Sequence, residues 1–261
     1  MLDIQNISVQ YGDAPPVIED FSLHVDQGDI VCLVGESGSG KTTVIRAVHG
    51  NLPGKGRVTE GDILFEGRSV LDFSPVQWRD IRGTEISMIF QDSGAMMNPI
   101  RTVGSQFVEY ILTHEDLSKK DAWEKGREML RSVRLPDPER VMKSYPFELS
   151  GGMRQRVGIA MAMVFRPKLL LADEPTSALD VTTQAQIVRQ MMQLREDYDT
   201  GIIVITHNLA LAAYMSDNIL VMKNGQVVDR GDRDFILHHP EDDYTKNLLT
   251  SVPSIGGMRF V

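Results

Sequence analysis

The first part of the chain alternates apolar and polar residues. Residues 4–11 and 21–25 follow this period-2 pattern, which is typical of strands with one face toward water and predicts an antiparallel β-layer. Residues 29–34 are almost continuously apolar and end at Gly35, as expected of a parallel strand buried on both faces. A helix is expected to follow over residues 42–49.

Two further buried strands are expected at residues 169–172 and 202–206, each followed by a helix. Strand, loop and helix thus alternate as in a doubly wound α/β fold around a parallel sheet. Residues 102–144 carry helical patterns instead, at 103–113 and 121–131, with few strand candidates. We therefore expect an α/β core with an inserted helical subdomain.

Composition and charge restrict the possible partners. The chain has 261 residues, 42% of them hydrophobic, which is enough for a large core. Its formal charge of −9 argues against a nucleic-acid partner, because phosphate backbones are bound mainly by Lys and Arg. A helix needs ~20 apolar residues to cross a bilayer, and the longest apolar run, residues 157–165, is less than half as long, so we expect no membrane span. Residues 1–12 lack the apolar core of a signal peptide. The single cysteine, Cys32, argues for a reducing compartment, the cytoplasm.

The segment GESGSGKT matches G-x-x-x-x-G-K-[ST] between a buried strand and a helix. Its glycines let backbone N–H groups turn toward phosphate oxygens, and the helix N-terminus adds partial positive charge. Lys41 is expected to reach the β- and γ-phosphates, Thr42 to bind Mg²⁺ and Thr43 to contact the α-phosphate. The sequence thus predicts ATP and Mg²⁺ as cofactors, held by Gly35, Glu36, Ser37, Gly38, Ser39, Gly40, Lys41, Thr42 and Thr43.

The segment LLLADEP places two carboxylates at the end of a buried strand, where side chains project into the ligand crevice of an α/β sheet. We assign Asp173 to Mg²⁺, through its water shell, and Glu174 to polarising the attacking water. The alternative interpretation is a solvated pair of acids at a strand end, and the presence of the phosphate loop argues against it. The chain is therefore expected to be an ATPase.

Residues 149–156, LSGGMRQR, resemble the signature motif of ATP-binding cassette (ABC) ATPases. Ser150, Gly151 and Gly152 would open a helix and form a second anion site, since a helix N-terminus can bind a γ-phosphate. The resemblance implies that this motif faces the nucleotide of a second cassette, identical or related, in a head-to-tail dimer. Each ATP would then lie between two subunits.

Other landmarks resemble the same family. Tyr11 resembles the aromatic residue that stacks on adenine, Gln91 the glutamine that reaches Mg²⁺ and water, and His207 the switch histidine at the γ-phosphate. Alternative roles are a strand-end tyrosine, a loop glutamine and a core histidine. Residues 177–180, SALD, resemble the loop where two cassettes meet. Asn208 departs from the Asp that commonly follows the switch histidine, which leaves the role of His207 in place.

The resemblance covers nearly the whole chain and implies a P-loop NTPase fold of the ABC ATPase type: a parallel sheet core, an antiparallel β-layer and an inserted helical subdomain. A single ABC ATPase domain is expected. Its parts would be a RecA-like core at residues 1–91 and 150–237, a helical signature subdomain at 92–149 and a short C-terminal tail, a mere appendage, at 238–261.

Three segments, FQDSGAMMNPIRTVGSQ, YPFELSGGMRQR and ALDVTTQAQIV, resemble the dipeptide, oligopeptide and nickel importer branch. This resemblance implies two transmembrane permease subunits as partners, indirectly a substrate-binding protein, and a position at the cytoplasmic face of the membrane. Met96, Met97, Asn98 and Pro99 are candidates for the surface that contacts the permease, although both methionines would equally suit packing inside the helical subdomain.

The end of the chain resembles the terminal motif of that branch but lacks the Cys-rich extension of longer members, so a short form of nickel-type length is expected. The alternative function is a soluble ABC ATPase of an enzyme complex, such as a phosphonate carbon–phosphorus lyase system. The sequence leaves open the transported substrate, whether the partner cassette is identical, and whether both ATP sites hydrolyse.

Overall fold

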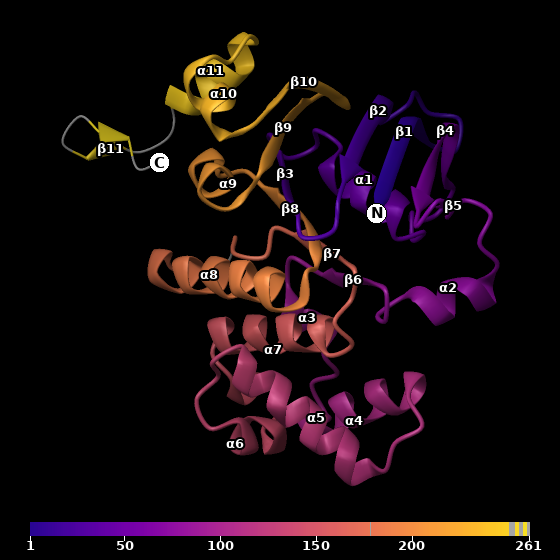
Figure 1. The fold of residues 1–261 in the computed structure, drawn as a ribbon, viewed down its shortest axis with the longest axis vertical. Helices are drawn as coiled ribbons and strands as arrows, with labels where there is room; N and C mark the ends of the chain where they lie inside the picture. The colour runs from indigo at the N-terminus through magenta and orange to yellow at the C-terminus, as the bar shows by residue number, and fades with distance from the viewer. Residues whose placement is uncertain (178, 251–253, 256–257, 260–261) are drawn as a thin grey trace.

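A six-stranded sheet forms the centre of the molecule in the computed structural model, which describes residues 1–177, 179–250, 254–255 and 258–259 (Figure 1). The strand order is β10-β9-β3-β8-β7-β6, with every neighbouring pair parallel except the edge pair β9 and β10. The strands are β3 (Ile30–Val34), β6 (Ile86–Ile89), β7 (Leu169–Asp173), β8 (Gly201–Thr206), β9 (Asn218–Lys223) and β10 (Gln226–Gly231).

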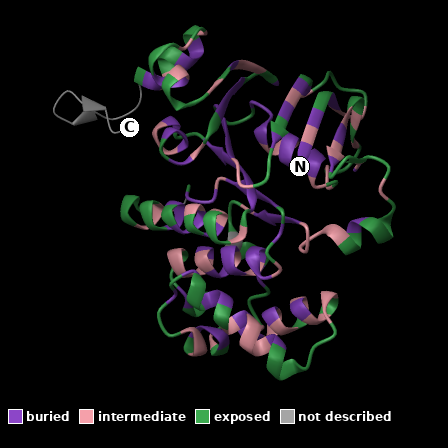
Figure 2. Cartoon of the chain, viewed as in Figure 1, coloured by how far each residue is buried: buried purple, intermediate pink, exposed green. Residues whose placement is uncertain are grey.

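The central strands are buried (Figure 2). Their alternate residues belong to two separate cores, one on each face of the sheet. In β3, Ile30, Cys32 and Val34 belong to one core, while Val31 and Leu33 belong to the other. Successive side chains of a strand point to opposite faces, so an uninterrupted apolar run can fill both. This explains why the predicted strands at β3, β7 and β8 are confirmed.

The predicted antiparallel layer covers one face of the central sheet and shares a core with helix α1 (Lys41–Val48). Its strand order is β2-β1-β4-β5, so it is larger than the two strands expected. The four strands are β1 (Leu2–Tyr11), β2 (Ile18–Val25), β4 (Gly56–Phe65) and β5 (Arg68–Ser69). Helix α2 (Pro75–Ile81) leads from this layer to β6.

The predicted helical subdomain gathers at one end of the molecule (Figure 1). Its principal helices begin at Thr102, Ser118 and Asp137, whose side chains each accept a hydrogen bond from the first turn, as Ser150 does for the helix that follows. Gly104 lets two helices approach closely, since a Cβ there would lie 2.4 Å from Cζ3 of Trp123. The elements are α3 (Ser93–Met96), α4 (Val103–His114), α5 (Lys119–Ser132), α6 (Pro138–Lys143) and the 3₁₀ turn η1 (Pro146–Glu148). Helix α7 (Gly151–Met163) follows the predicted subdomain and packs against α5.

The C-terminal part packs against the core as far as Thr250. The prediction of a short appendage is therefore wrong for residues 238–250. Tyr244, Thr245 and Leu249 are buried against the core. Asp229 of β10 is buried and accepts backbone hydrogen bonds from the segment before α11. The remaining elements are α8 (Val181–Tyr198), α9 (Leu209–Met215), α10 (Arg233–His238), α11 (Asp243–Thr250), β11 (Ser254–Ile255) and β12 (Met258–Arg259). None of the helices within the described ranges is long and apolar enough to cross a membrane.

Candidate active site

The loop between β3 and α1 has the backbone that its glycines allow. Gly35 and Gly40 have φ of +155° and +100°, and a Cβ on them would lie 2.2 Å from the Met222 carbonyl oxygen and 2.3 Å from Cδ1 of Ile18. Both glycines are therefore required by close packing as well as by conformation. Gly38, with φ of +85°, has open space around its missing Cβ. The loop is therefore closely packed at Gly35 and Gly40 and has free space around Gly38.

Lys41 lies inside this loop with only 4% of its surface exposed. Its Nζ donates to the carbonyl oxygens of Gly35 at 2.7 Å and Glu36 at 2.6 Å, and to Oγ of Ser39 at 3.1 Å. Burial lowers the pKa of Lys41, opposed chiefly by the nearby Glu174 carboxylate. No ion pair to Lys41 occurs within the described residues. A buried cation that is bonded only to neutral oxygens favours the arrival of an anion.

Thr42 and Asp173 bring two oxygen ligands together beside that loop. The Thr42 hydroxyl donates to Oδ1 of Asp173 at 3.1 Å, and burial raises the pKa of this carboxyl. A hydroxyl and a carboxylate, completed by phosphate oxygens, are the ligands that Mg²⁺ prefers. No cluster of three or more His, Cys, Asp or Glu side chains that could hold a metal occurs in the described parts of the chain.

Glu174 contacts two residues that are far from it in sequence, Gln91 and His207. Its Oε2 accepts a hydrogen bond from Nε2 of Gln91 at 3.2 Å and lies 3.5 Å from Nδ1 of His207. Its backbone has φ of +44°, an unfavourable conformation for a residue with a Cβ, and its N–H donates to the Ile205 carbonyl at 3.1 Å. Such strain is concentrated at functional sites, where the surrounding structure holds it in place.

Tyr11 ends β1 beside the first turn of α1, and its hydroxyl lies 3.5 Å from Oγ1 of Thr43. The ring covers Gly56 on the neighbouring strand, where a Cβ would lie 2.6 Å from Cε1 of the tyrosine. Tyr11 is therefore an aromatic surface next to the predicted phosphate loop.

The signature residues lie apart from the phosphate loop of the same chain. Ser150 is the exposed N-cap of α7 and accepts a hydrogen bond from the Met153 N–H at 3.3 Å. Gly151 and Gly152 open this helix, and Gly152 packs against Thr183 of α8. The structure brings together the predicted residues 11, 35–43, 91, 173, 174 and 207. Of residues 150–152, only Gly151 lines a cavity with members of this group.

A cavity of about 590 Å³ separates these two groups. Gln91, Glu174 and His207 line it from the core, and Gly151 and Arg154 line it from α7. None of the residues described in the phosphate loop lines this cavity. Gln91, Glu174 and His207 therefore face α7 across this cavity.

The loop after Glu174 is described except for Ala178, which lies outside the described residues. Ser177 donates its hydroxyl to the Glu174 carbonyl at 3.2 Å, and Asp180 caps α8 by accepting from the Thr183 N–H at 3.0 Å. Asn208, the departure noted in the sequence, caps α9 by accepting from the Leu211 N–H at 3.1 Å.

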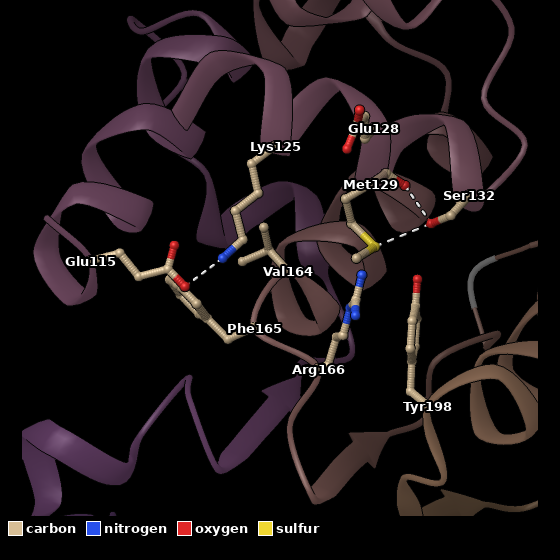
Figure 3. Close-up of a pocket in the computed structure, with 9 residues that line it drawn as sticks. All are labelled: Glu115, Lys125, Glu128, Met129, Ser132, Val164, Phe165, Arg166 and Tyr198. Atoms are coloured by element: carbon tan, nitrogen blue, oxygen red, sulfur yellow. Dashed lines mark hydrogen bonds and ion pairs between the residues drawn. The ribbon is translucent and has the colours of Figure 1, made fainter. Parts of the chain in front are cut away.

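A second cavity, of about 420 Å³, lies at the edge of the helical subdomain and contains no predicted site residue (Figure 3). The Lys125 ammonium is paired with Glu115 at 2.5 Å and lies over the Phe165 ring. The Arg166 guanidinium lies over the Tyr198 ring. Because both cations already have partners, this cavity is a weaker candidate for a nucleotide.

Two contacts to the phosphate loop were missed by the sequence interpretation. The Gly225 N–H donates to the Ser39 carbonyl at 3.1 Å, and the Glu36 N–H donates to the Tyr244 hydroxyl at 2.8 Å. The Asn-Gly pair before β10 is a hairpin signal that would have located Gly225 near a turn. No local signal connects Tyr244 to a loop more than 200 residues earlier.

Comparisons with known proteins agree with this geometry. The chain is 42% identical over 259 residues to "Oligopeptide transport ATP-binding protein OppD" of Bacillus subtilis, covering 98% of this chain and 72% of that protein. It is 43% identical over 256 residues to "Dipeptide transport ATP-binding protein DppD" of Escherichia coli, covering 97% and 78%. The ADP- and Pi-bound cassette MJ0796 superposes with a TM-score of 0.78 at 27% identity, covering 89% of this chain and 99% of that one. The profile of the ABC transporter family matches residues 18–177, and the chain belongs to that family.

Proposed function

We propose that this chain is the ATP-hydrolysing subunit of an importer for peptides, nickel or metal chelates. The observation that carries the proposal is the catalytic cluster, in which Glu174 contacts both Gln91 and His207 beside a buried lysine. The printed names of the two relatives, oligopeptide and dipeptide transport ATP-binding proteins, support peptides as the class of cargo.

The phosphate loop binds ATP and orients it. Lys41 exchanges its carbonyl partners for the β- and γ-phosphates, which compensates its buried charge. Thr42 would hold Mg²⁺ directly and Asp173 would hold it through its water shell, and the ion would neutralise charge on the phosphates. Tyr11 offers its ring to the adenine.

The catalytic cluster acts on the attacking water. Glu174 accepts a hydrogen bond from this water and polarises it. The Gln91 amide donates a hydrogen bond to the Glu174 carboxylate and would also reach Mg²⁺. His207 has 62% of its side chain exposed and is free to contact the γ-phosphate. Its proximity to Glu174 orients both groups around one reacting centre.

Exposure of the two half-sites supports a head-to-tail dimer. Ser37 and Gly38 in the phosphate loop are exposed, and so are Ser150 and Gly151 at the N-terminus of α7. Val181, which follows the loop at residues 177–180, has 82% of its surface exposed and is therefore accessible to a second chain. We propose that a second cassette covers these surfaces, and that residues 92–149 form the helical signature subdomain between the core segments 1–91 and 150–237.

A groove of about 190 Å³ between the core and the helical subdomain suits contact with a permease. It is lined mainly by apolar side chains, among them Met88, Met96, Tyr110 and Met161. Met96 is 58% exposed, whereas Met97 is 5% exposed and packs inside the subdomain. We propose that Met96, with the exposed residues 98–99, contacts one of two permease subunits at the cytoplasmic face of the membrane, and that a substrate-binding protein delivers the cargo.

Glu174→Gln tests the catalytic assignment. The amide keeps the shape of the side chain but loses the basic carboxylate, so ATP binding is retained while turnover falls by ~100-fold or more and a closed dimer accumulates. The measurements are phosphate release and nucleotide binding by calorimetry. Glu196→Gln, an exposed acid on α8, is the matched control and keeps wild-type turnover. Wild-type turnover in Glu174→Gln would refute the assignment.

Affinity purification tests the importer assignment. The tagged chain is expected to co-purify from detergent extracts with two membrane proteins. Recovery with soluble enzyme subunits alone would favour the carbon–phosphorus lyase type of complex instead.

A further inference from the structure

Helix α11 reaches the phosphate loop from the other end of the chain. The Tyr244 hydroxyl accepts a hydrogen bond from the Glu36 N–H at 2.8 Å, and Tyr244 is only 9% exposed. Lys223 of β9 lies with its ammonium 5.1 Å from the centre of the tyrosine ring. Helices α10 and α11 lie beside β9 and β10, so this contact comes from a packed part of the fold (Figure 1).

The position of Tyr244 is fixed by hydrogen bonds at the start of α11. The buried Asp229 carboxylate accepts from the N–H groups of Glu241 and Asp242, both at 3.1 Å. Asp242 in turn accepts from the Tyr244 N–H at 2.7 Å. The hydroxyl is therefore held against the loop by β10, with little freedom to follow another partner.

The contact acts on one peptide plane of the loop. The N–H of Glu36 and the carbonyl of Gly35 belong to the same planar peptide unit. Tyr244 binds the N–H side, and Lys41 donates to the carbonyl side at 2.7 Å. When Lys41 turns to phosphate, the carbonyl loses that donor, and Tyr244 becomes the side chain that keeps the plane in place.

We propose that Tyr244 is a positioning residue for the phosphate loop, which acts through the Gly35–Glu36 peptide and strengthens ATP binding without touching the nucleotide. The C-terminal helix is thereby part of the nucleotide site. This inference rests on the proposed role of residues 35–43 in binding phosphates.

Tyr244→Phe removes the hydroxyl and keeps the ring. One hydrogen bond is lost, so ATP affinity measured by calorimetry on the full chain falls about threefold to tenfold. The Glu36 amide, followed by NMR in protein carrying ¹⁵N-glutamate, exchanges with solvent faster than in the wild type. In the assembled importer KM for ATP rises while kcat is unchanged, a split that a purely structural role would not produce. Tyr214→Phe, at a tyrosine of α9 that is 53% exposed, is the matched control and changes neither value.

ATP affinity of Tyr244→Phe within twofold of the wild type overturns the proposal, whatever the exchange rate of the Glu36 amide. Lys41→Ala separates this failure from a failure of the phosphate loop itself. Weakened binding in Lys41→Ala with normal binding in Tyr244→Phe refutes the positioning role alone. Unchanged binding in Lys41→Ala refutes the assignment of the loop, and the positioning role with it.

Discussion

His49 gives the fold a defined sensitivity to acid. It follows the last residue of α1, and its carbonyl accepts a hydrogen bond from Nε of Arg82 at 3.0 Å. Burial, followed by the charge of Arg82, lowers the pKa of His49 from 6.5 to about 4. The folded protein therefore holds a neutral imidazole where the unfolded chain would bind a proton.

The sign and size of the effect follow from this difference. The stabilising contribution is complete above pH 6.5 and is lost as the pH falls toward the folded pKa of about 4, because only the unfolded chain gains a proton in that interval. Between pH 7 and pH 5 this loss amounts to about 2 kcal/mol of the free energy of unfolding.

The assay is urea unfolding followed by circular dichroism at pH 7 and pH 5. The wild type is expected to lose about 2 kcal/mol more than His49→Gln over this interval, since glutamine cannot titrate. His238→Gln, at an exposed position that ends α10, is the control and retains the wild-type loss. An equal loss in the wild type and His49→Gln would refute the reasoning.

Two further predictions concern packing and assembly. Gly104→Ala lowers the free energy of unfolding by about 1–3 kcal/mol, because the added Cβ lies 2.4 Å from Trp123 and 2.7 Å from the Met142 carbonyl. The measurement is urea unfolding; Gly151→Ala, whose Cβ meets nothing closer than 3.8 Å, is the control, and equal stability of the two variants would contradict the prediction. If only a dimer hydrolyses ATP, the rate of phosphate release by the purified chain rises with the square of its concentration while most chains are monomers. A rate strictly proportional to chain concentration in that range would show that one chain hydrolyses ATP alone.

The strands that the sequence predicts best are those with long, uninterrupted apolar runs. β7 and β8 fill two cores at once, so their composition alone identifies them. β6 escaped prediction because it has four residues, one of them Ser87, whose hydroxyl is buried and interacts with Tyr110. β9 and β10 were missed although the Asn224–Gly225 pair between them, with φ of +49° and +83°, is a hairpin signal.

The site residues also differ in how well the sequence predicts them, because some lie in one continuous motif and others meet only in the folded chain. The phosphate loop is a continuous motif, so its residues could be assigned one by one. Gln91 and Glu174 are 83 residues apart, and only family resemblance related them before their contact at 3.2 Å was seen. Met97 and Tyr244 show what resemblance leaves out, because burial and long-range contacts depend on how whole elements pack.

The positions of the half-sites are the reason why we propose that hydrolysis requires a pair of chains. Within one chain, His207 has 62% and Glu174 has 21% of its side chain exposed, and both line a cavity that opens to the surface. In the proposed mechanism, a water held there by Glu174 would remain in exchange with solvent, and the high dielectric would weaken each charge that stabilises the transition state. A second cassette that covers Ser37 and Gly38 with its own signature helix would exclude this solvent and add a helix N-terminus toward the γ-phosphate. In this proposal one chain would supply the binding loop and the carboxylate, and closure of the dimer would supply the environment in which they act.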